Sequence, residues 1–430
     1  MRRKSSSKIA VIIAIVFAFF VSLSSSVGGA VSSPGRSSAQ PGSGLSAPTA
    51  GLPRVFCMDP SRLALVKSRL AGGDTSLQSA LKRLRERGDS SLKEGPFSVM
   101  DKTSIPPSGD KHDYMSRGPY WWPDPNKPDG LPYIRRDGYR NPEVRANAFD
   151  RTAIGSMFGA VSTLALAYYF TDYEPYAEHA SELLRIWFLD PKTKMNPNLQ
   201  YAQAIPGVVE GRGIGIIDTA GLTGMIDSIG LIERSKAWTD ADDKAMRAWC
   251  WAYLEWLRTS GNGRDEDKAE NNHGTYYDAQ RVSLALYTGR AELARDILKS
   301  VPARRIDIQI TPDGRQPLEL ARANSFGYSV MNLNGHVNLA QMAQSLGIDL
   351  WNYESRDGRS LRKAIDYLAQ YADPEKEWPH SQIGRASTSQ LLPLLHRAAI
   401  AYNDDRYEAL IKKASPERAA DSGMQFVWPR

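Results

Sequence analysis

Two short segments of the chain carry side chains of the kinds that move protons next to an anion. The first is Asn271-Asn272-His273, and the second contains Arg322 and, six residues later, Tyr328. A neutral imidazole can remove a proton and a phenol can supply one, while amide and guanidinium groups spread a developing negative charge. This set of groups suits the removal of a weakly acidic C–H proton next to a carboxylate.

One reaction that needs these groups is β-elimination in a 4-linked uronate, which removes the C5 proton and expels O4. We expect His273 to act as the base and Tyr328 as the acid, with no metal or cofactor if amide and guanidinium groups neutralise the carboxylate. Where H5 and O4 lie on the same face, as in mannuronate or glucuronate, one tyrosine could serve both roles. Where they lie on opposite faces, as in guluronate, separate His and Tyr groups fit better.

Each of these signals also has a structural explanation when taken alone. Asn271 and Asn272 precede a predicted helix, where asparagine is a good N-cap, and the start of a helix also attracts anions. A lone tyrosine is more often a packed residue whose hydroxyl group is hydrogen-bonded. The functional prediction therefore depends on the combination, which spans 55 residues from His273 to Tyr328.

A proline-rich loop upstream gathers aromatic and basic residues. Residues 111–125 include His112, Arg117 and the run Tyr120-Trp121-Trp122, and Arg136 follows. Prolines exclude a regular helix here, and aromatic faces beside arginines suit the binding of acidic sugars. The alternative is that the loop buries its two tryptophans in the core.

A glycine-rich segment from Gln203 to Gly215 lacks the features of a phosphate-binding or dinucleotide-binding loop. Its glycines allow either a tight structural turn or close approach to a ligand, in which case Arg212 could reach an acidic substrate. The predicted substrate-binding set is therefore Asn271, Tyr120, Trp121, Trp122, Arg117, His112, Gln203, Arg212 and Arg136.

Apolar periodicity predicts a mostly helical domain. The expected helices cover residues 147–170, 173–188, 218–232, 240–258, 276–287, 291–300, 335–346, 360–371 and 387–403, with Thr239 as an N-cap. Helices joined by short loops pack antiparallel, so we expect an all-α, incomplete or closed (α/α) toroid of helical hairpins. One small β-hairpin is predicted at Arg305–Ile310, before the turn Thr311–Gly314.

The N-terminal residues have the pattern of an export signal. Arg2, Arg3, Lys4 and Lys8 precede the apolar run Ile9–Val21, and small residues up to Ala30 fit a cleavage site. We predict a signal peptide at 1–30, a Ser/Gly/Pro-rich linker at 31–51 and one lyase-type domain at 52–430. The protein would then be exported, periplasmic or secreted, without stable membrane association; an uncleaved anchor is the alternative.

The net charge of the chain says little about its binding partners once the predicted signal peptide is removed. The chain has 54 basic and 48 acidic residues, but four of the positive charges belong to the signal, so the remainder is near +2. No nucleic-acid partner is expected, and an acidic polysaccharide is the predicted one. The two cysteines, Cys57 and Cys250, could be bonded or free, and neither they nor the histidines have metal-ligand spacing.

The ordered set of motifs resembles the alginate lyase family. The resemblance rests on Asn271-Asn272-His273, Arg322 with Tyr328, residues 112–114 and 120–125, and Gly211-Arg212-Gly213-Ile214-Gly215. It is closer to the alginate- and glucuronan-cleaving branch, polysaccharide lyase family thirty-eight, than to family five. It implies an (α/α) toroid, export and metal-independent lysis. Carboxylate neutralisation would fall to Asn272 and Arg322, and proton transfer to His273 and Tyr328.

Two other classes of function remain open at this point. A glycoside hydrolase would need two carboxylic acids flanking the scissile bond, for which Asp113, Asp124, Asp218 and Glu319 are available. A polysaccharide-binding protein would keep the aromatic and basic loop without cutting the chain. The sequence also leaves open the uronic acid, internal or terminal cleavage, and the oligomeric state.

Overall fold

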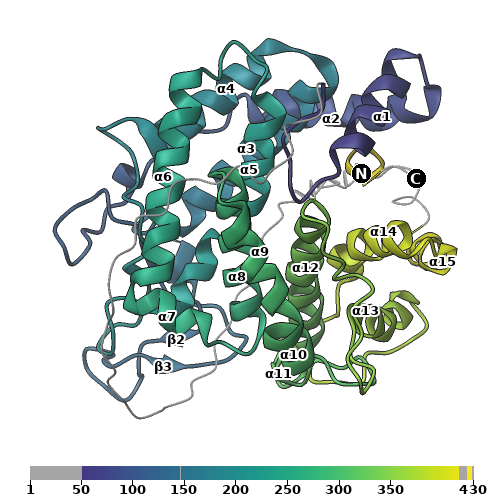
Figure 1. Ribbon diagram of the computed structural model, residues 1–430. Helices are drawn as coiled ribbons and strands as arrows, with labels where there is room; N and C mark the ends of the chain where they lie inside the picture. The colour runs from purple at the N-terminus through teal and green to yellow at the C-terminus, as the bar shows by residue number, and fades with distance from the viewer. Residues whose placement is uncertain (1–50, 146, 416–423, 429–430) are drawn as a thin grey trace, which may run out of the picture.

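Helices make up most of the computed structural model, which describes residues 51–145, 147–415 and 424–428 (Figure 1). The predicted signal peptide and all but the last residue of the predicted linker lie outside these residues. The helices are α1 (Pro60–Ala71), α2 (Gln78–Ser91), α3 (Arg151–Thr171), α4 (Glu174–Leu184), α5 (Leu222–Ile232), α6 (Asp240–Thr259), α7 (Gly261–Asp267), α8 (Asn272–Tyr287), α9 (Ala291–Val301), α10 (Asp307–Gln309), α11 (Pro317–Leu320), α12 (Ser325–Gln344), α13 (Leu361–Ala369), α14 (Leu391–Tyr402), α15 (Asp405–Ala414) and α17 (Met424–Val427).

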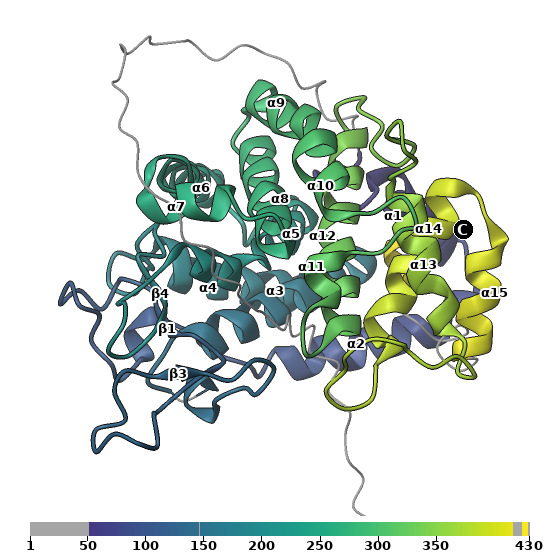
Figure 2. The same ribbon diagram turned by 90° about the horizontal axis from the view of Figure 1, so that it is seen from below.

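The helices pack as an all-α toroid of hairpins, as predicted. In the interior α3 packs on α5, α5 on α8, and α8 on α12. On the flanks, α2 and α4 pack on α3, α6 and α9 on α8, and α13 and α14 on α12 (Figure 2). Residues 151–171 and 213–232 are long and apolar enough to cross a membrane by composition alone, but both belong to this packed interior.

Local sequence fixes several helix ends. Thr239 accepts from the backbone of Asp242, and the Asp242 side chain accepts in return from the backbone of Thr239, which forms the capping box of α6. Helix α14 ends at Asn403 in the left-handed conformation. The predicted start of α6 is therefore confirmed, and its end differs by one residue.

Two helices begin earlier than predicted. Helix α8 starts at Asn272 instead of residue 276, and α12 starts at Ser325 instead of residue 335. The first half of α12 is buried on nearly every side, so it lacks the polar face that would mark it as an amphipathic helix. Both missed turns carry predicted site residues.

The predicted β-hairpin at Arg305–Ile310 is wrong. This segment is a π-helical turn, η6 (Pro302–Ile306), that continues α9 and runs into α10. Its buried positions are 305, 306, 309 and 310, which is helical spacing and not the alternation of a strand. The turn at Thr311–Gly314 is present: the backbone N–H of Gly314 donates to the carbonyl oxygen of Thr311 at 2.8 Å.

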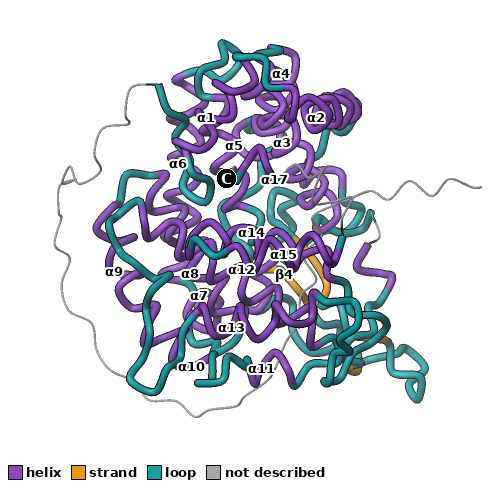
Figure 3. The backbone as a smooth tube through the Cα atoms, turned by 90° about the vertical axis from the view of Figure 1, so that its right-hand side faces the viewer, coloured by secondary structure: helices purple, strands orange, loops and turns teal. Residues whose placement is uncertain are grey.

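Strands within the described residues form two small sheets (Figure 3). β1 (Met115–Arg117) pairs in parallel with β4 (Tyr201–Ala204), and β2 (Trp121–Trp122) pairs antiparallel with β3 (Ile134–Arg135). These pairs give a fixed backbone to the aromatic loop and to the glycine-rich segment. Cys57 and Cys250 are both free and buried.

Candidate active site

His273 is held by a buried carboxylate. It lies in the first turn of α8, where the Asn271 side chain accepts a hydrogen bond from its backbone N–H at 3.2 Å. Its Nδ1 atom lies 2.7 Å from Oε1 of Glu266 on α7, and both side chains are almost fully buried. Because the carboxylate accepts at Nδ1, the imidazole has a fixed orientation.

Asn272, the neighbouring residue, is held by a second buried carboxylate. Its backbone N–H and its Nδ2 atom donate to Oε1 of Glu319 at 2.7 and 3.0 Å, and Nδ2 also lies 2.9 Å from Oε2. Burial raises the pKa of Glu319, against the lowering effect of these hydrogen bonds. Glu319 ends the short helix α11, three residues before Arg322.

Arg322 lies between a loop carboxylate and a tyrosine ring. Its Nε donates to Oδ2 of Asp137 at 3.3 Å, and its Nη2 donates to the other oxygen of the same carboxylate. Its guanidinium carbon lies 4.3 Å from the centre of the Tyr328 ring, a cation–π distance. Arg322 therefore joins the loop after β3 to the first turn of α12.

Tyr328 and Tyr120 form a pair of buried phenols. Their hydroxyl oxygens lie 3.4 Å apart. Burial raises the pKa of Tyr328 well above its ordinary value and that of Tyr120 to about 12, although hydrogen bonding to Tyr328 and the charge of Arg140 oppose the rise at Tyr120. Both phenols are therefore protonated at neutral pH.

The four predicted catalytic residues are brought together from three elements. Glu319 binds Asn272 and lies one turn before Arg322, which stacks on Tyr328. Tyr276, one turn after Asn272 on α8, shares a small buried cluster with Tyr120 and Tyr328. The Tyr276 hydroxyl donates to the carbonyl oxygen of Met331 on α12 at 3.0 Å, which ties the two helices together.

The glycine-rich segment supports Arg212. Gln203, which is fully buried with a positive φ of 49°, accepts at its carbonyl oxygen from Nε of Arg212 at 2.9 Å. Its Nε2 donates to Asp218 at 2.9 Å. Burial lowers the pKa of Arg212 to about 10, although the charges of Asp218 and Glu266 oppose this. Arg212 therefore remains charged at neutral pH, and its guanidinium carbon lies 5.8 Å from the centre of a Trp121 ring.

The two tryptophans are half-buried in the pairing of β2 with β3 and do not join the core. Arg136 lies over the Trp122 ring at 5.5 Å, and Nε1 of Trp122 donates to the carbonyl oxygen of Tyr139 at 2.8 Å. Tyr139 itself is 62% exposed. Trp122, Arg136 and Tyr139 thus form a surface where an aromatic face and a cation lie side by side.

Two predicted residues have structural partners of their own. Arg117 pairs with Glu143 at 3.1 Å and lies over the rings of Tyr133 and Phe149. The His112 ring nitrogen Nδ1 lies 2.6 Å from the carbonyl oxygen of Lys194. These contacts connect loops at the edge of the site and do not link either residue to the four predicted catalytic side chains.

The carboxylates considered for hydrolysis are occupied. Asp218 accepts from Tyr114, Ser116 and Gln203 and pairs with Arg151. Glu319 binds Asn272, while Asp113 accepts from Ser108, Asn196 and Asn198, and Asp124 accepts from Asn126. Each carboxylate therefore holds local structure.

Sequence analysis missed four residues that shape the site. Glu266, Asp137 and Arg140 were not selected, and Glu319 was considered only as a hydrolytic acid. Glu266 stands in the acidic run Asp265-Glu266-Asp267, where nothing distinguishes it from its neighbours. Asp137 lies 185 residues from Arg322, so only the fold could pair them.

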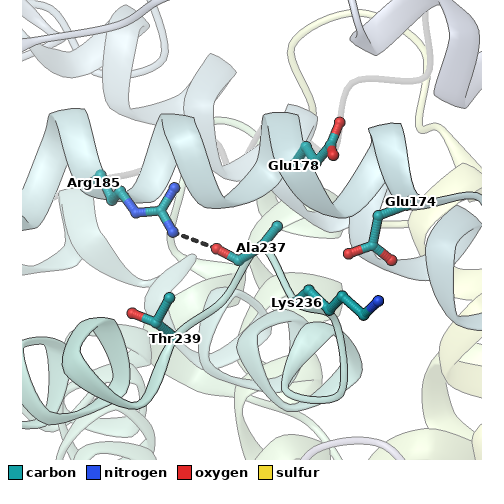
Figure 4. Close-up of a pocket in the computed structure, with 6 residues that line it drawn as sticks. All are labelled: Glu174, Glu178, Arg185, Lys236, Ala237 and Thr239. Carbon is teal, nitrogen blue, oxygen red and sulfur yellow. Dashed lines mark hydrogen bonds between the residues drawn. The ribbon is translucent and has the colours of Figure 1, made fainter.

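A separate surface pocket of about 420 Å³ contains none of the predicted residues. It is lined by charges of both signs, and Arg185 on its wall donates to the carbonyl oxygen of Ala237 (Figure 4).

Across residues 51–145, 147–415 and 424–428, no group of three or more His, Cys, Asp or Glu residues could hold a metal ion.

Comparisons with known proteins agree on one family. The alginate lyase family model matches residues 98–378. An alginate lyase from Bacteroides ovatus of known crystal structure is 44% identical, with a TM-score of 0.83 over 88% of this chain and 99% of that one. No curated protein matches.

More distant structures share the fold alone. Alginate lyase A1-III from Sphingomonas species A1 is 14% identical, with a TM-score of 0.54 over 88% of this chain and 98% of that one. Its histidine-to-alanine variant complexed with tetrasaccharide is 15% identical, with a TM-score of 0.52 over 82% and 90% of the two chains.

The helical toroid and these matches define a polysaccharide lyase. The chain belongs to the alginate lyase family.

Proposed function

We propose that this enzyme cuts a 4-linked polyuronate, alginate or glucuronan, by metal-independent β-elimination. The observation that carries the proposal is the contact chain from Asn272 through Glu319 to Arg322 and Tyr328, with His273 beside it. In this proposal the base, the acid, the amide and the guanidinium act on one uronate. The similarity to an alginate lyase across almost the whole chain supports the same substrate class.

In the proposed reaction His273 removes the C5 proton while Tyr328 protonates O4. The electron pair of the C5–H bond forms the C4–C5 double bond as the C4–O4 bond breaks, so the products are an unsaturated uronate and a new sugar end. In this proposal Arg322 and Asn272 neutralise the negative charge that develops on the carboxylate. Stabilising charge that appears only in the transition state raises the rate directly.

The resting protonation of the site favours separate acid and base groups. Tyr328 is a neutral phenol with a raised pKa, because burial disfavours its phenolate. It can donate a proton at once, whereas removing one would require prior ionisation. This arrangement fits a uronate whose H5 and O4 leave from opposite faces, as in guluronate.

The surrounding cations and aromatic rings form the proposed substrate-binding surface. Trp121 with Arg212, and Trp122 with Arg136, combine an apolar face for a sugar ring with a charge for its carboxylate. Tyr120 packs against Tyr328. Gln203 and Asn271 act by supporting Arg212 and His273, and Arg117 and His112 by shaping the loops.

The test is an ultraviolet absorbance assay on polymannuronate, polyguluronate, glucuronan and polygalacturonate, with and without a chelator. We expect an absorbing unsaturated product from a 4-linked polyuronate, at a rate that the chelator leaves unchanged. Chain scission without new absorbance would indicate a hydrolase. Binding without scission would indicate a carbohydrate-binding protein.

We also propose that the protein is exported, to the periplasm or the medium, and that residues 1–30 are its signal peptide. Cell fractionation with mass spectrometry of the N-terminus tests this proposal. The expected mature chain begins near residue 31. A full-length chain retained in the membrane fraction would support an uncleaved anchor instead.

A further inference from the structure

The Asp137 carboxylate lies between two arginines. Its Oδ1 atom accepts from Nη2 of Arg135 at 2.9 Å, and Arg322 donates to the two carboxylate oxygens through Nε and Nη2. The backbone N–H of Ala323 donates to Oδ2 at 3.3 Å. Two guanidinium groups and one carboxylate leave one net positive charge, so a substrate anion is still attracted to this place.

The backbone on either side of Asp137 has a fixed course. Arg135 belongs to β3, which pairs with β2. Gly138 has a φ of 78°, and a Cβ atom there would lie 2.3 Å from Cδ1 of Ile383 and 3.1 Å from Cβ of Ala323. The loop after β3 therefore packs closely against the segment just before α12, and glycine suits both the conformation and the contact.

Both backbone groups of Ala323 are hydrogen-bonded. Its N–H donates to Asp137, and its carbonyl oxygen accepts from the backbone N–H of Ile383 at 2.7 Å. Arg322 comes directly before this residue, and Tyr328 lies in the first turn of α12, which follows it. The bonds at Asp137 therefore fix where the guanidinium group lies relative to the phenol.

We propose that Asp137 is a positioning residue, which holds Arg322 against the Tyr328 ring and stays bound to it during the reaction. The inference rests on the proposed function and adds to it a residue that touches no substrate atom. An arginine side chain has many rotamers, and the two-pronged bond to Asp137 selects the one whose plane contacts the phenol. The substrate carboxylate consequently does not use the Nε–Nη2 edge of Arg322.

The alternative is that Asp137 imitates the substrate carboxylate and must leave before the substrate binds. Burial tends to raise the pKa of Asp137, but the hydrogen bond and charge of Arg322 and the N–H of Ala323 outweigh it and hold the pKa below its ordinary value. Asp137 is therefore ionised at neutral pH. Its departure would break an ion pair whose arginine is almost fully buried, which is costly.

Formate tests this position, because it carries the same carboxylate group as the side chain. Asp137→Ala leaves space between the two arginines, and solvent reaches it, since the Asp137 side chain is 29% exposed. We expect kcat on a polyuronate to fall by about 10- to 100-fold, as for lost hydrogen bonds to a charged group, with KM changed much less. Added formate should restore kcat in a saturable way, and chloride at equal concentration should not.

Two further variants serve as controls. Asp137→Asn keeps the shape of the side chain without its charge, so kcat should fall and formate should find no space to bind. Asp357→Ala removes a more exposed carboxylate, which pairs with Arg359 two residues away at 2.8 Å. Its kcat should equal that of the wild type with or without formate. Thermal melts establish that each variant is folded.

The outcomes separate the inference from the proposed function. Wild-type kcat in folded Asp137→Ala and Asp137→Asn, or no restoration of Asp137→Ala by formate, would overturn the inference. A lower KM in Asp137→Ala, with inhibition by formate, would overturn it in favour of a carboxylate that imitates the substrate. If the wild type gave no unsaturated product from any 4-linked polyuronate, the proposed function would be refuted, and the inference with it.

Discussion

In the proposed reaction, the phenol pair determines which proton transfer is possible from the resting state. Their hydroxyl oxygens, on Tyr328 and Tyr120, lie 3.4 Å apart. Arg322 lies over the Tyr328 ring, and the charge of Arg140 acts on Tyr120. These cations would stabilise a phenolate, yet burial outweighs them and the pKa of both hydroxyl groups remains raised. In the proposed reaction, the arginines would therefore help most once Tyr328 has given up its proton.

Tyr328→Phe should abolish elimination while the fold persists. The substitution removes only a hydroxyl group, whose loss costs about 1 kcal/mol of stability, but it removes the proton donor, worth about 10²- to 10⁴-fold in kcat. Tyr276→Phe is the matched control, since it removes another buried hydroxyl group from the same cluster. Ultraviolet turnover assays with thermal melts measure both effects. Retained turnover would remove Tyr328 from the mechanism.

Arg322→Lys should reduce kcat/KM even though the positive charge remains. An ammonium group cannot keep the two-pronged bond to Asp137 together with the planar contact on the Tyr328 ring. We expect a loss of about 10- to 100-fold, corresponding to a hydrogen bond to a charged group. Arg315→Lys alters an exposed pair with Asp313, where a change of less than about twofold is expected. Equal effects of the two substitutions would contradict the role of Arg322.

Among the elements, the contact between η5 (Gly213–Thr219) and β4 positions Arg212. A Cβ atom at Gly215 would lie 2.5 Å from Cβ and 2.6 Å from the carbonyl oxygen of Ala202. The glycine therefore permits close approach to a strand and not, at this position, to a ligand. This settles one alternative left by the sequence for this part of the glycine-rich segment.

Gly215→Ala should lower the free energy of unfolding by about 1–3 kcal/mol, as overpacking does, and reduce activity because Arg212 moves with the backbone. Gly224→Ala, in α5, is the control, because its Cβ would meet nothing within 4 Å. There the expected change is neutral or stabilising by up to about 1 kcal/mol. Urea unfolding measures the free energy of unfolding of both variants. Equal values would mean that the backbone of β4 shifts to make room for the added methyl group.

On helix α5, a titratable carboxyl group binds the backbone near the start of the described chain. Asp227 is fully buried and accepts from the backbone N–H groups of Phe56, Cys57 and Met58 at 2.7–2.9 Å. Burial raises the pKa of Asp227 to about 7, against the lowering effect of these bonds. An unfolded aspartate has a pKa of about 3.9.

Between about pH 4 and pH 7 the folded protein thus binds a proton at Asp227 that the unfolded chain does not. Stability of the wild type relative to Asp227→Asn should rise as pH falls through this window and stay constant above it. The comparison of both proteins by urea unfolding at pH 5 and pH 8 cancels other titrating groups. A difference independent of pH would show that the carboxyl group does not titrate there.

The sequence predicted the amphipathic elements better than the buried ones. Helix α6 was found because Thr239 caps it and its polar face contrasts with its apolar one. The starts of α8 and α12 were missed because their first turns, including Asn272 and Tyr328, are buried on nearly all sides. The grouping of predicted site residues came from residue chemistry and family resemblance. Their partners Glu266 and Asp137 depend on tertiary packing that no local pattern encodes.

At the scale of the whole molecule, the last described segment joins the two ends of the toroid. Helix α17, labelled in Figure 3, contacts α1. The Phe426 ring lies 5.0 Å from that of Phe170 on α3. On the other side the carbonyl oxygen of Trp428 lies 2.6 Å from Nε2 of His396 on α14. The first and last hairpins thus share one hydrophobic contact.

Phe426→Ala tests whether this contact holds the toroid together. Phe426 is fully buried, and truncation of a buried phenylalanine costs about 3–5 kcal/mol. Leu65→Ala on α1, where the side chain is 51% exposed, should cost much less. Because the contact lies away from His273 and Tyr328, kcat per folded molecule should be unchanged while the melting temperature falls. If Phe426→Ala lowers the melting temperature no more than Leu65→Ala does, then α1, α3 and α14 are held together without the C-terminal segment.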